Sequence, residues 1–115
     1  MHAHERAAQV WSVLALAARN RQILTYDILS QLVGVPARGF AHILDHIQRY
    51  CLQQRLPPLT ILVVNGATGL PGKGFFAERN IPRHQAKVFN YDWLKHGAPT
   101  PDDLAEAMEV ARRDR

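Results

Sequence analysis

The sequence lacks the features that mark secreted, membrane and disulfide-rich proteins. Its 115 residues include one cysteine, Cys51, so neither an internal disulfide nor a cysteine-rich zinc site can form. No apolar run reaches the ~20 residues that span a bilayer, and the longest candidate, residues 7–18, is interrupted by polar side chains. The segment before it is charged, and no small-residue cleavage site follows. We therefore expect a cytoplasmic protein with no membrane contact.

Signatures of catalysis, cofactor binding and metal binding are also missing. The glycine-rich stretch 66–74 fails as a nucleotide-binding loop, because its spacing is one residue too long and Gly74 replaces the metal-binding Ser or Thr. His42 and His46 have the i, i+4 spacing of a metal-binding pair, but no third ligand can be assigned. Neither paired carboxylates nor a nucleophile with its base can be placed together. We predict no enzymatic activity, no cofactor and no metal.

The net charge of the chain is positive. A net charge of +4 fits a polyanionic partner, because Lys and Arg gain free energy by displacing counterions from phosphates. Three of the arginines lie in the last four residues, where a solvated chain end is the simpler interpretation. Charge alone therefore permits nucleic-acid binding without requiring it.

Helical periodicity dominates the first half of the chain. It predicts helices over residues 5–19, 26–33 and 37–55. Thr25 is placed to cap the second helix, whose Ile28, Leu29 and Leu32 we expect to face inward. Gly34 and Pro36 form a tight break before the third helix. Its buried stripe should comprise Phe40, Ile43, Leu44, Ile47 and Cys51.

Two β-strands are predicted in the second half. Residues 59–65 form a β-branched run, and residues 87–93 alternate well enough to pair with them as a hairpin. Phe89, Tyr91 and Trp93 on the second run are expected in the core rather than as a base-stacking platform. The connection over residues 67–85 is long, and Thr100 starts a C-terminal helix that reaches residue 113.

This order of elements defines the predicted fold. It is α+β, with a three-helix winged-helix-like core, a two-stranded hairpin and an extra C-terminal helix. We assign residues 1–98 to the winged-helix-like domain and residues 99–115 to the C-terminal helix and basic tail. The second and third helices then form a helix-turn-helix, with Arg38 at the start of the longer one.

Residues 24–74 also resemble a known family. The stretch from Leu24 to Gly34, then Pro36 to Gly39, Leu56 to Pro58, and Val63-Val64 before a glycine-rich loop, resembles the DNA-binding domain of the alkylguanine-DNA alkyltransferases and the alkyltransferase-like proteins. The resemblance implies that Tyr26 contacts and rotates a phosphate. It implies that Arg38 inserts into the duplex from the minor groove in place of a flipped base.

The catalytic signature of that family is absent. Where its Pro-Cys-His-Arg should precede the two valines, this chain has Leu59-Thr60-Ile61-Leu62. No thiolate is available there and no histidine activates one, so alkyl transfer is excluded. The alkyltransferase-like proteins also lack this cysteine, and the resemblance therefore implies a binder.

The leading hypothesis is a non-enzymatic protein of winged-helix type that binds nucleic acid, with duplex DNA as the expected form. Its predicted contacts are Tyr26, Arg38, His42, Arg49, Lys73, Arg79 and Arg83. The alternative is a protein-interaction module, an adaptor, inhibitor or partner-binding subunit, that uses the 67–85 loop with Phe75 and Phe76 or the C-terminal helix. One continuous basic surface would favour nucleic acid, and exposed phenylalanines would favour a protein partner.

Overall fold

A computed structural model describes residues 1–72 and 80–114. Helices and 3-10 turns take up 68% of these residues and strands 5%. The predicted α+β class is therefore wrong, because the described part of the chain is mainly helical. None of its helices is long and apolar enough to cross a membrane.

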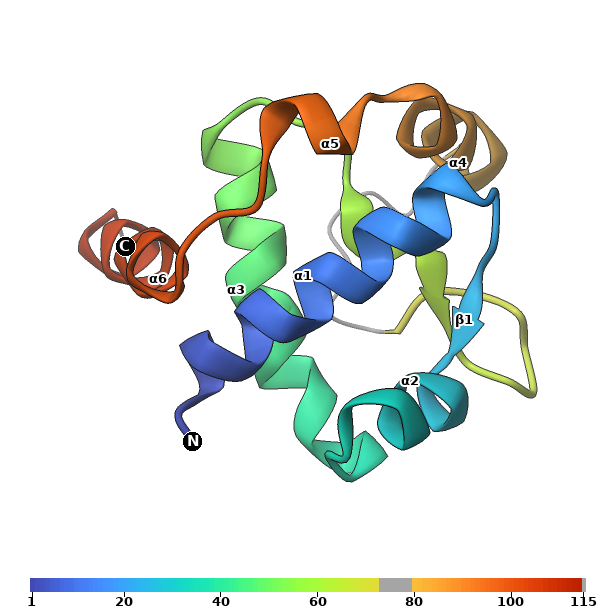
Figure 1. The fold of residues 1–115 in the computed structure, drawn as a ribbon, viewed down its shortest axis with the longest axis horizontal. Helices are drawn as coiled ribbons and strands as arrows, with labels where there is room; N and C mark the ends of the chain where they lie inside the picture. Colours follow the sequence, from blue (N-terminus) through green and yellow to red (C-terminus); the bar gives the residue numbers. More distant parts are fainter. Residues whose placement is uncertain (73–79, 115) are drawn as a thin grey trace.

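Three helices form the body of the molecule (Figure 1). Helix α1 (Ala3–Arg19) packs against α3 (Phe40–Gln53), and α6 (Pro101–Arg113) packs against both. Trp11 of α1 is buried at their centre, with its ring edge-on to Tyr50 and Trp93 at centroid distances of 5.5 and 5.6 Å. Burial of apolar side chains from all three helices stabilises this arrangement.

The predicted stripe of α3 is confirmed. Phe40, Ile43, Leu44, Ile47 and Cys51 are all buried. In the shorter α2 (Tyr26–Val33), Leu29 is buried, but Ile28 and Leu32 are 46% and 60% exposed, so their predicted inward orientation is wrong. An eight-residue helix at the edge of the molecule covers the core with one row of side chains only.

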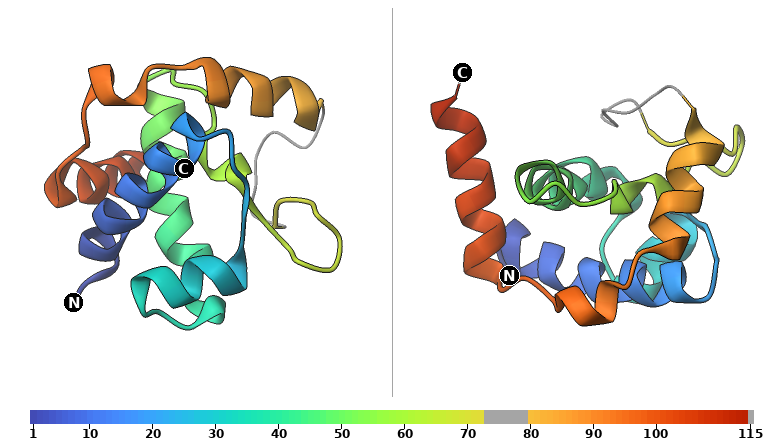
Figure 2. Two further views of the ribbon diagram at one scale, coloured as in Figure 1. Left: turned by 45° about the vertical axis from the view of Figure 1, so that its right-hand side comes forward. Right: turned by 90° about the horizontal axis from the view of Figure 1, so that it is seen from above.

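The only sheet among the described residues is a parallel pair. Strand β1 (Leu24–Thr25) pairs with β2 (Val63–Val64), with Leu24 opposite Val63 and Thr25 opposite Val64. The chain between them runs through α2, the 3-10 turn η1 (Ala37–Gly39), α3 and the 3-10 turn η2 (Leu59–Leu62). Such a crossover is what parallel pairing requires, and it brings the start of α2 beside the end of β2 (Figure 2).

The predicted hairpin does not form. Residues 87–93, expected as its second strand, instead complete α4 (Ile81–Asn90) and begin the short α5 (Trp93–His96). Ile81, Val88 and Phe89 recur at helical spacing and pack on the core, and Pro82 stands in the first turn of α4. The alternating aromatics have the period of a strand, which explains the wrong prediction. The core position expected for Trp93 is confirmed.

The first half of the predicted 59–65 strand is also wrong. Its β-branched run begins as η2, in which the Ile61 amide donates to the Pro58 carbonyl at 3.0 Å. All four side chains of η2 are buried against α1, α3 and α4. Burial on every side, rather than on one face of a sheet, explains the continuous apolar pattern.

The C-terminal helix begins where the sequence places it. The Thr100 hydroxyl accepts from the Asp103 amide at 3.1 Å, and the Asp103 carboxylate accepts from the Thr100 amide at 2.9 Å. This capping box satisfies the first donors of α6. The apolar face of α6, with Leu104 and Ala107 buried, is covered by α1 and α3 of the same chain.

Candidate nucleic-acid interface

The N-cap of α2 fixes Tyr26 as the first residue of that helix. The Thr25 hydroxyl accepts a hydrogen bond from the Ile28 amide at 3.1 Å, so the helix begins at Tyr26 as predicted. Because Thr25 is also the residue paired with Val64, the Tyr26 side chain rises beside the loop that follows β2.

Arg38 is positioned by the break between α2 and α3. Gly34 ends α2 with φ of 72°, a left-handed conformation, and its amide donates to the Ser30 carbonyl at 2.9 Å. Pro36 then precedes η1, whose middle residue is Arg38. The sequence predicted the break, although a 3-10 turn replaces the first turn of the expected helix. Arg38 is exposed.

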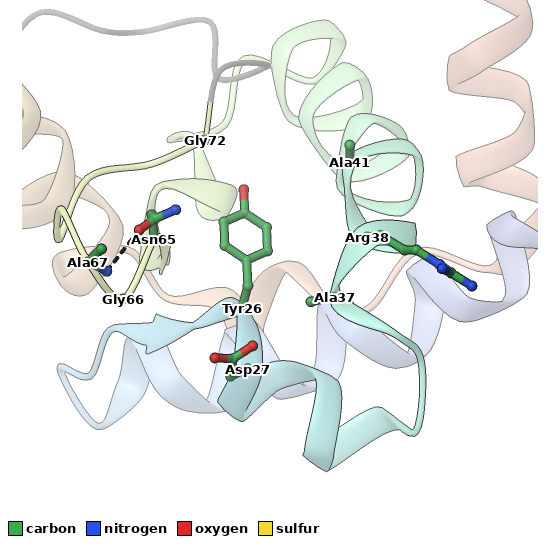
Figure 3. A pocket seen from close by; sticks show the side chains of 9 residues that line it. All are labelled: Tyr26, Asp27, Ala37, Arg38, Ala41, Asn65, Gly66, Ala67 and Gly72. Atoms are coloured by element: carbon green, nitrogen blue, oxygen red, sulfur yellow. Dashed lines mark hydrogen bonds between the residues drawn. The ribbon is translucent and has the colours of Figure 1, made fainter.

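Tyr26 and Arg38 line one hollow. Its volume is about 650 Å³, and α2, η1, the start of α3 and the loop after β2 all contribute to it. Tyr26 stands between the loop and α3, while the guanidinium of Arg38 is directed away from Tyr26 (Figure 3). The lining residues are Tyr26, Asp27, Ala37, Arg38, Ala41, Asn65, Gly66, Ala67 and Gly72.

The loop wall of this hollow is held by Asn65. Its side-chain oxygen accepts from the backbone amides of Ala67 and Thr68 at 2.8 and 3.3 Å. The Asn65 amide donates to the Leu70 carbonyl at 2.8 Å, and the Gly69 amide donates to the Asn65 carbonyl at 2.7 Å. These bonds close a tight turn that requires φ of 70° at Gly69.

Gly72 brings the far end of the same loop against Tyr26. A Cβ atom built on Gly72 would clash with the Tyr26 hydroxyl, so only glycine allows this approach. Burial raises the pKa of the Tyr26 phenol, and a hydrogen bond with the Gly72 backbone opposes that rise. The phenol is therefore protonated at neutral pH and can donate a hydrogen bond to a phosphate oxygen.

The other predicted contacts are more scattered. His42 is exposed on α3, one turn beyond Arg38. Arg49 is half-buried and its Nε lies 3.3 Å from an oxygen of Asp45, which offsets its charge. Arg83 is exposed on α4, and α4 and α2 lie at opposite ends of the short sheet (Figures 1 and 2). Lys73 and Arg79, like Phe75 and Phe76, lie outside the described residues.

Two polar residues of the hollow were not predicted. Asp27 carries a carboxylate next to Tyr26, and Asn65 directs its side-chain nitrogen toward Tyr26 (Figure 3). The Asn65-Gly66 pair is a common turn signal that could have identified Asn65. Nothing in the sequence near Asp27 distinguishes it from an ordinary acid in the first turn of a helix.

The histidine pair of α3 forms a packing contact. The rings of His42 and His46 lie 4.9 Å apart and nearly perpendicular, and Nδ1 of the buried His46 donates to the His42 carbonyl at 2.8 Å. Within residues 1–72 and 80–114, no group of three or more His, Cys, Asp or Glu side chains is placed to hold a metal.

The site of the missing catalytic motif is buried and without a thiol. Thr60 in η2 is 6% exposed, and its hydroxyl has no hydrogen-bond partner among the described residues. Cys51 is buried in α3, and burial raises the pKa of its thiol to about 12. This thiol is protonated at neutral pH and is not a nucleophile.

Comparison of the chain with protein-family models, with curated proteins and with solved structures gives no match. None of these comparisons bears on the resemblance to the alkyltransferase-like proteins, which rests on the segments matched within residues 24–74 and stays a prediction.

Proposed function

We propose that this chain is a non-enzymatic nucleic-acid-binding protein of the cytoplasm, and that duplex DNA is its ligand. One observation supports this proposal above the others. Tyr26 and Arg38, which the alkyltransferase-like resemblance assigns to DNA, line one hollow although twelve positions separate them in the sequence.

The chemistry of this surface is compatible with the roles proposed for the two residues. The protonated Tyr26 phenol donates a hydrogen bond to a backbone phosphate, and the exposed Arg38 extends from η1 toward the duplex. His42 is exposed one turn further along the chain, in α3. The glycine-rich wall lets a nucleic-acid strand approach the backbone closely.

The net charge of +4 contributes affinity without sequence preference. Asp27 opposes it locally, because a carboxylate in the hollow repels phosphate. We therefore propose modest affinity that depends on a few placed contacts.

The contribution of the two residues is tested by fluorescence anisotropy with a short labelled duplex. Arg38→Ala and Tyr26→Phe should each weaken binding by about 1 to 3 kcal/mol. Arg113→Ala removes the same charge from the end of α6, and Tyr91→Phe removes a phenol hydroxyl outside the hollow, so both controls should bind nearly as the wild type does. Equal losses from Arg38→Ala and Arg113→Ala would reduce the arginine effect to net charge, and equal losses from Tyr26→Phe and Tyr91→Phe would show that the position of the hydroxyl does not matter. Either result would refute the placed contact that it tests.

A duplex that does not bind at low salt would exclude the proposed function altogether. The protein-interaction alternative would then take its place. Its contact would lie elsewhere than on the apolar face of α6, which the chain itself covers.

A further inference from the structure

A row of exposed polar side chains runs along the outer face of α4, and two of them are cations. Arg83, Lys87 and Asn90 follow one another at spacings of four and three residues, so they share one side of the helix, and all three are exposed. The opposite side packs on the core through Ile81 and Val88. Among the described residues, no carboxylate pairs with Arg83 or Lys87. Both charges therefore face solvent.

Arg21, just beyond the end of α1, extends this row. Its guanidinium donates to the side-chain oxygen of Asn90 at 2.7 Å and lies 5.9 Å from the centroid of the Phe89 ring. Its backbone has φ of 55°, a left-handed conformation that usually favours glycine or asparagine after a helix. The Arg21 side chain is thus held on α4. We call Arg21, Arg83, Lys87 and Asn90 the basic ridge.

The basic ridge lies in an acid-free part of the chain. Residues 10–26 and 80–91, which include both of its segments, contain no Asp or Glu. Asp92 follows immediately, but its carboxylate accepts from the Lys95 amide at 3.1 Å and caps α5. Four of the ten acidic residues lie on α6, at the other end of the molecule (Figures 1 and 2). This separation makes the ridge electropositive.

The basic ridge offers hydrogen-bond donors to a ligand. Arginine and lysine side chains only donate, and the side-chain oxygen of Asn90 is occupied by Arg21. The matching ligand therefore carries closely spaced anions. An acidic peptide would gain little there, because exposed ion pairs with carboxylates contribute little to affinity. A nucleic-acid backbone gains more, because each neutralised phosphate releases condensed counterions.

The basic ridge and the hollow are close enough for one duplex to contact both. Arg21 and Tyr26 are five residues apart, and a fully extended chain spans at most about 3.6 Å per residue, so their Cα atoms lie within about 18 Å of each other. At a rise of about 3.4 Å, this distance corresponds to about five base pairs. Helix α4 and the loop after β2, which forms one wall of the hollow, also lie on the same side of the molecule, away from α6 (Figures 1 and 2).

We propose that the basic ridge binds the phosphate backbone in the flank of the duplex that contacts Tyr26 and Arg38. This inference rests on the proposed function and adds a second contact, which contributes affinity without sequence preference. Neither the lining of the hollow nor the alkyltransferase-like segment, residues 24–74, includes a residue of the ridge.

The experiment compares the ridge variant, Arg83→Ala/Lys87→Ala, with the control variant, Arg112→Ala/Arg113→Ala, which removes the same charge from the end of α6. Fluorescence anisotropy measures the affinity for a duplex of about 16 base pairs, long enough for both surfaces, as the salt concentration rises. At low salt the ridge variant should bind on the order of tenfold more weakly, and its log–log slope should fall by about two. The control variant should keep the slope, and equal losses in both variants would overturn the inference.

Both variants replace exposed side chains, and circular dichroism verifies that they fold. Arg21 is left intact, because it joins the end of α1 to α4.

Stoichiometry and coupling show whether one duplex contacts both surfaces. Calorimetry should find one duplex per protein molecule. Arg38→Ala added to the ridge variant should multiply the two losses of affinity, because both contacts belong to one complex. Two duplexes per molecule, one removed by Arg38→Ala and the other by the ridge variant, would mean that the ridge takes a separate duplex and would overturn the inference.

The remaining outcomes separate the inference from the function on which it rests. Wild-type affinity and slope in the ridge variant, with binding still weakened by Arg38→Ala, would overturn the inference alone. A loss in the ridge variant without any loss from Arg38→Ala would refute the proposed contact at the hollow, and the shared duplex with it. Failure of the duplex to bind at low salt would overturn both.

Discussion

At the scale of single residues, the sequence predicted the two prominent members of the candidate site. Tyr26 and Arg38 occupy positions fixed by strong local signals, the Thr25 cap and the Gly34 break. Asp27 escaped prediction because it looks like an ordinary acid in the first turn of a helix, and Asn65 because it meets Tyr26 only through the pairing of β1 with β2. Local signals fix where a helix begins, and tertiary contacts decide which side chains meet.

The contact between Gly72 and Tyr26 gives a prediction at this scale. Gly72→Ala forces the Tyr26 hydroxyl to move, and we expect it to lower the free energy of unfolding by roughly 1 kcal/mol. Tyr26→Phe removes the clashing oxygen, so the double variant should recover most of that loss. Urea denaturation of the four proteins measures the coupling, and simple additivity would show that the two residues do not contact each other.

At the scale of elements, capping and periodicity predicted most of the helices. Helix α2 has the predicted bounds, and α6 begins at its Thr100 cap. The strand over residues 87–93 was wrong, because alternating aromatics satisfied a period of two while Ile81, Val88 and Phe89 satisfied the helical period. The parallel pairing of two-residue strands leaves no periodic trace in the sequence.

The packing of α1 on α3 predicts a dependence of stability on pH. His46 is buried, and burial lowers its pKa below the ordinary value of 6.5; the hydrogen bond to the His42 carbonyl and the Asp45 carboxylate oppose this shift without cancelling it. The unfolded chain therefore binds this proton more tightly than the folded one. The contribution of His46 to stability is complete above about pH 6.5 and is lost as the pH falls through the lower folded-state pKa.

The measurement is the free energy of unfolding between pH 7.5 and 5, compared in wild type and His46→Gln. The wild type should lose more stability across this range, because the variant has no imidazole to protonate. His96→Gln, an exposed histidine of α5, is the control for general titration. If stability depended on pH in the same way in wild type and His46→Gln, His46 would not be the source of the pH dependence.

At the scale of the whole molecule, several of the described arginines are paired or lie away from the hollow. Arg49 is paired with Asp45, Arg83 lies on α4, and Arg112 is paired with Glu109 at 3.2 Å. Of the described cations, Arg38 is the one that lines the hollow. We therefore expect DNA bound at the hollow to have few phosphates neutralised by the described residues.

A shallow salt dependence follows from this distribution. We expect the affinity for duplex DNA to fall with a log–log slope that corresponds to about two to four phosphate contacts. Arg38→Ala should reduce the slope by about one, whereas Arg113→Ala should leave it unchanged. Titrations between low and physiological salt measure both slopes. A steep dependence that is shared by the two variants would indicate diffuse binding over the whole surface.

The location of the interface is the central claim, and amide chemical shifts test it most directly. A short DNA duplex titrated at low salt into ¹⁵N-labelled protein should shift the amides of residues 26–27, 37–42 and 65–72, which surround the hollow, and should leave those of α6 in place. Shifts concentrated on α5 and α6, or an unchanged spectrum, would contradict a nucleic-acid interface at Tyr26 and Arg38.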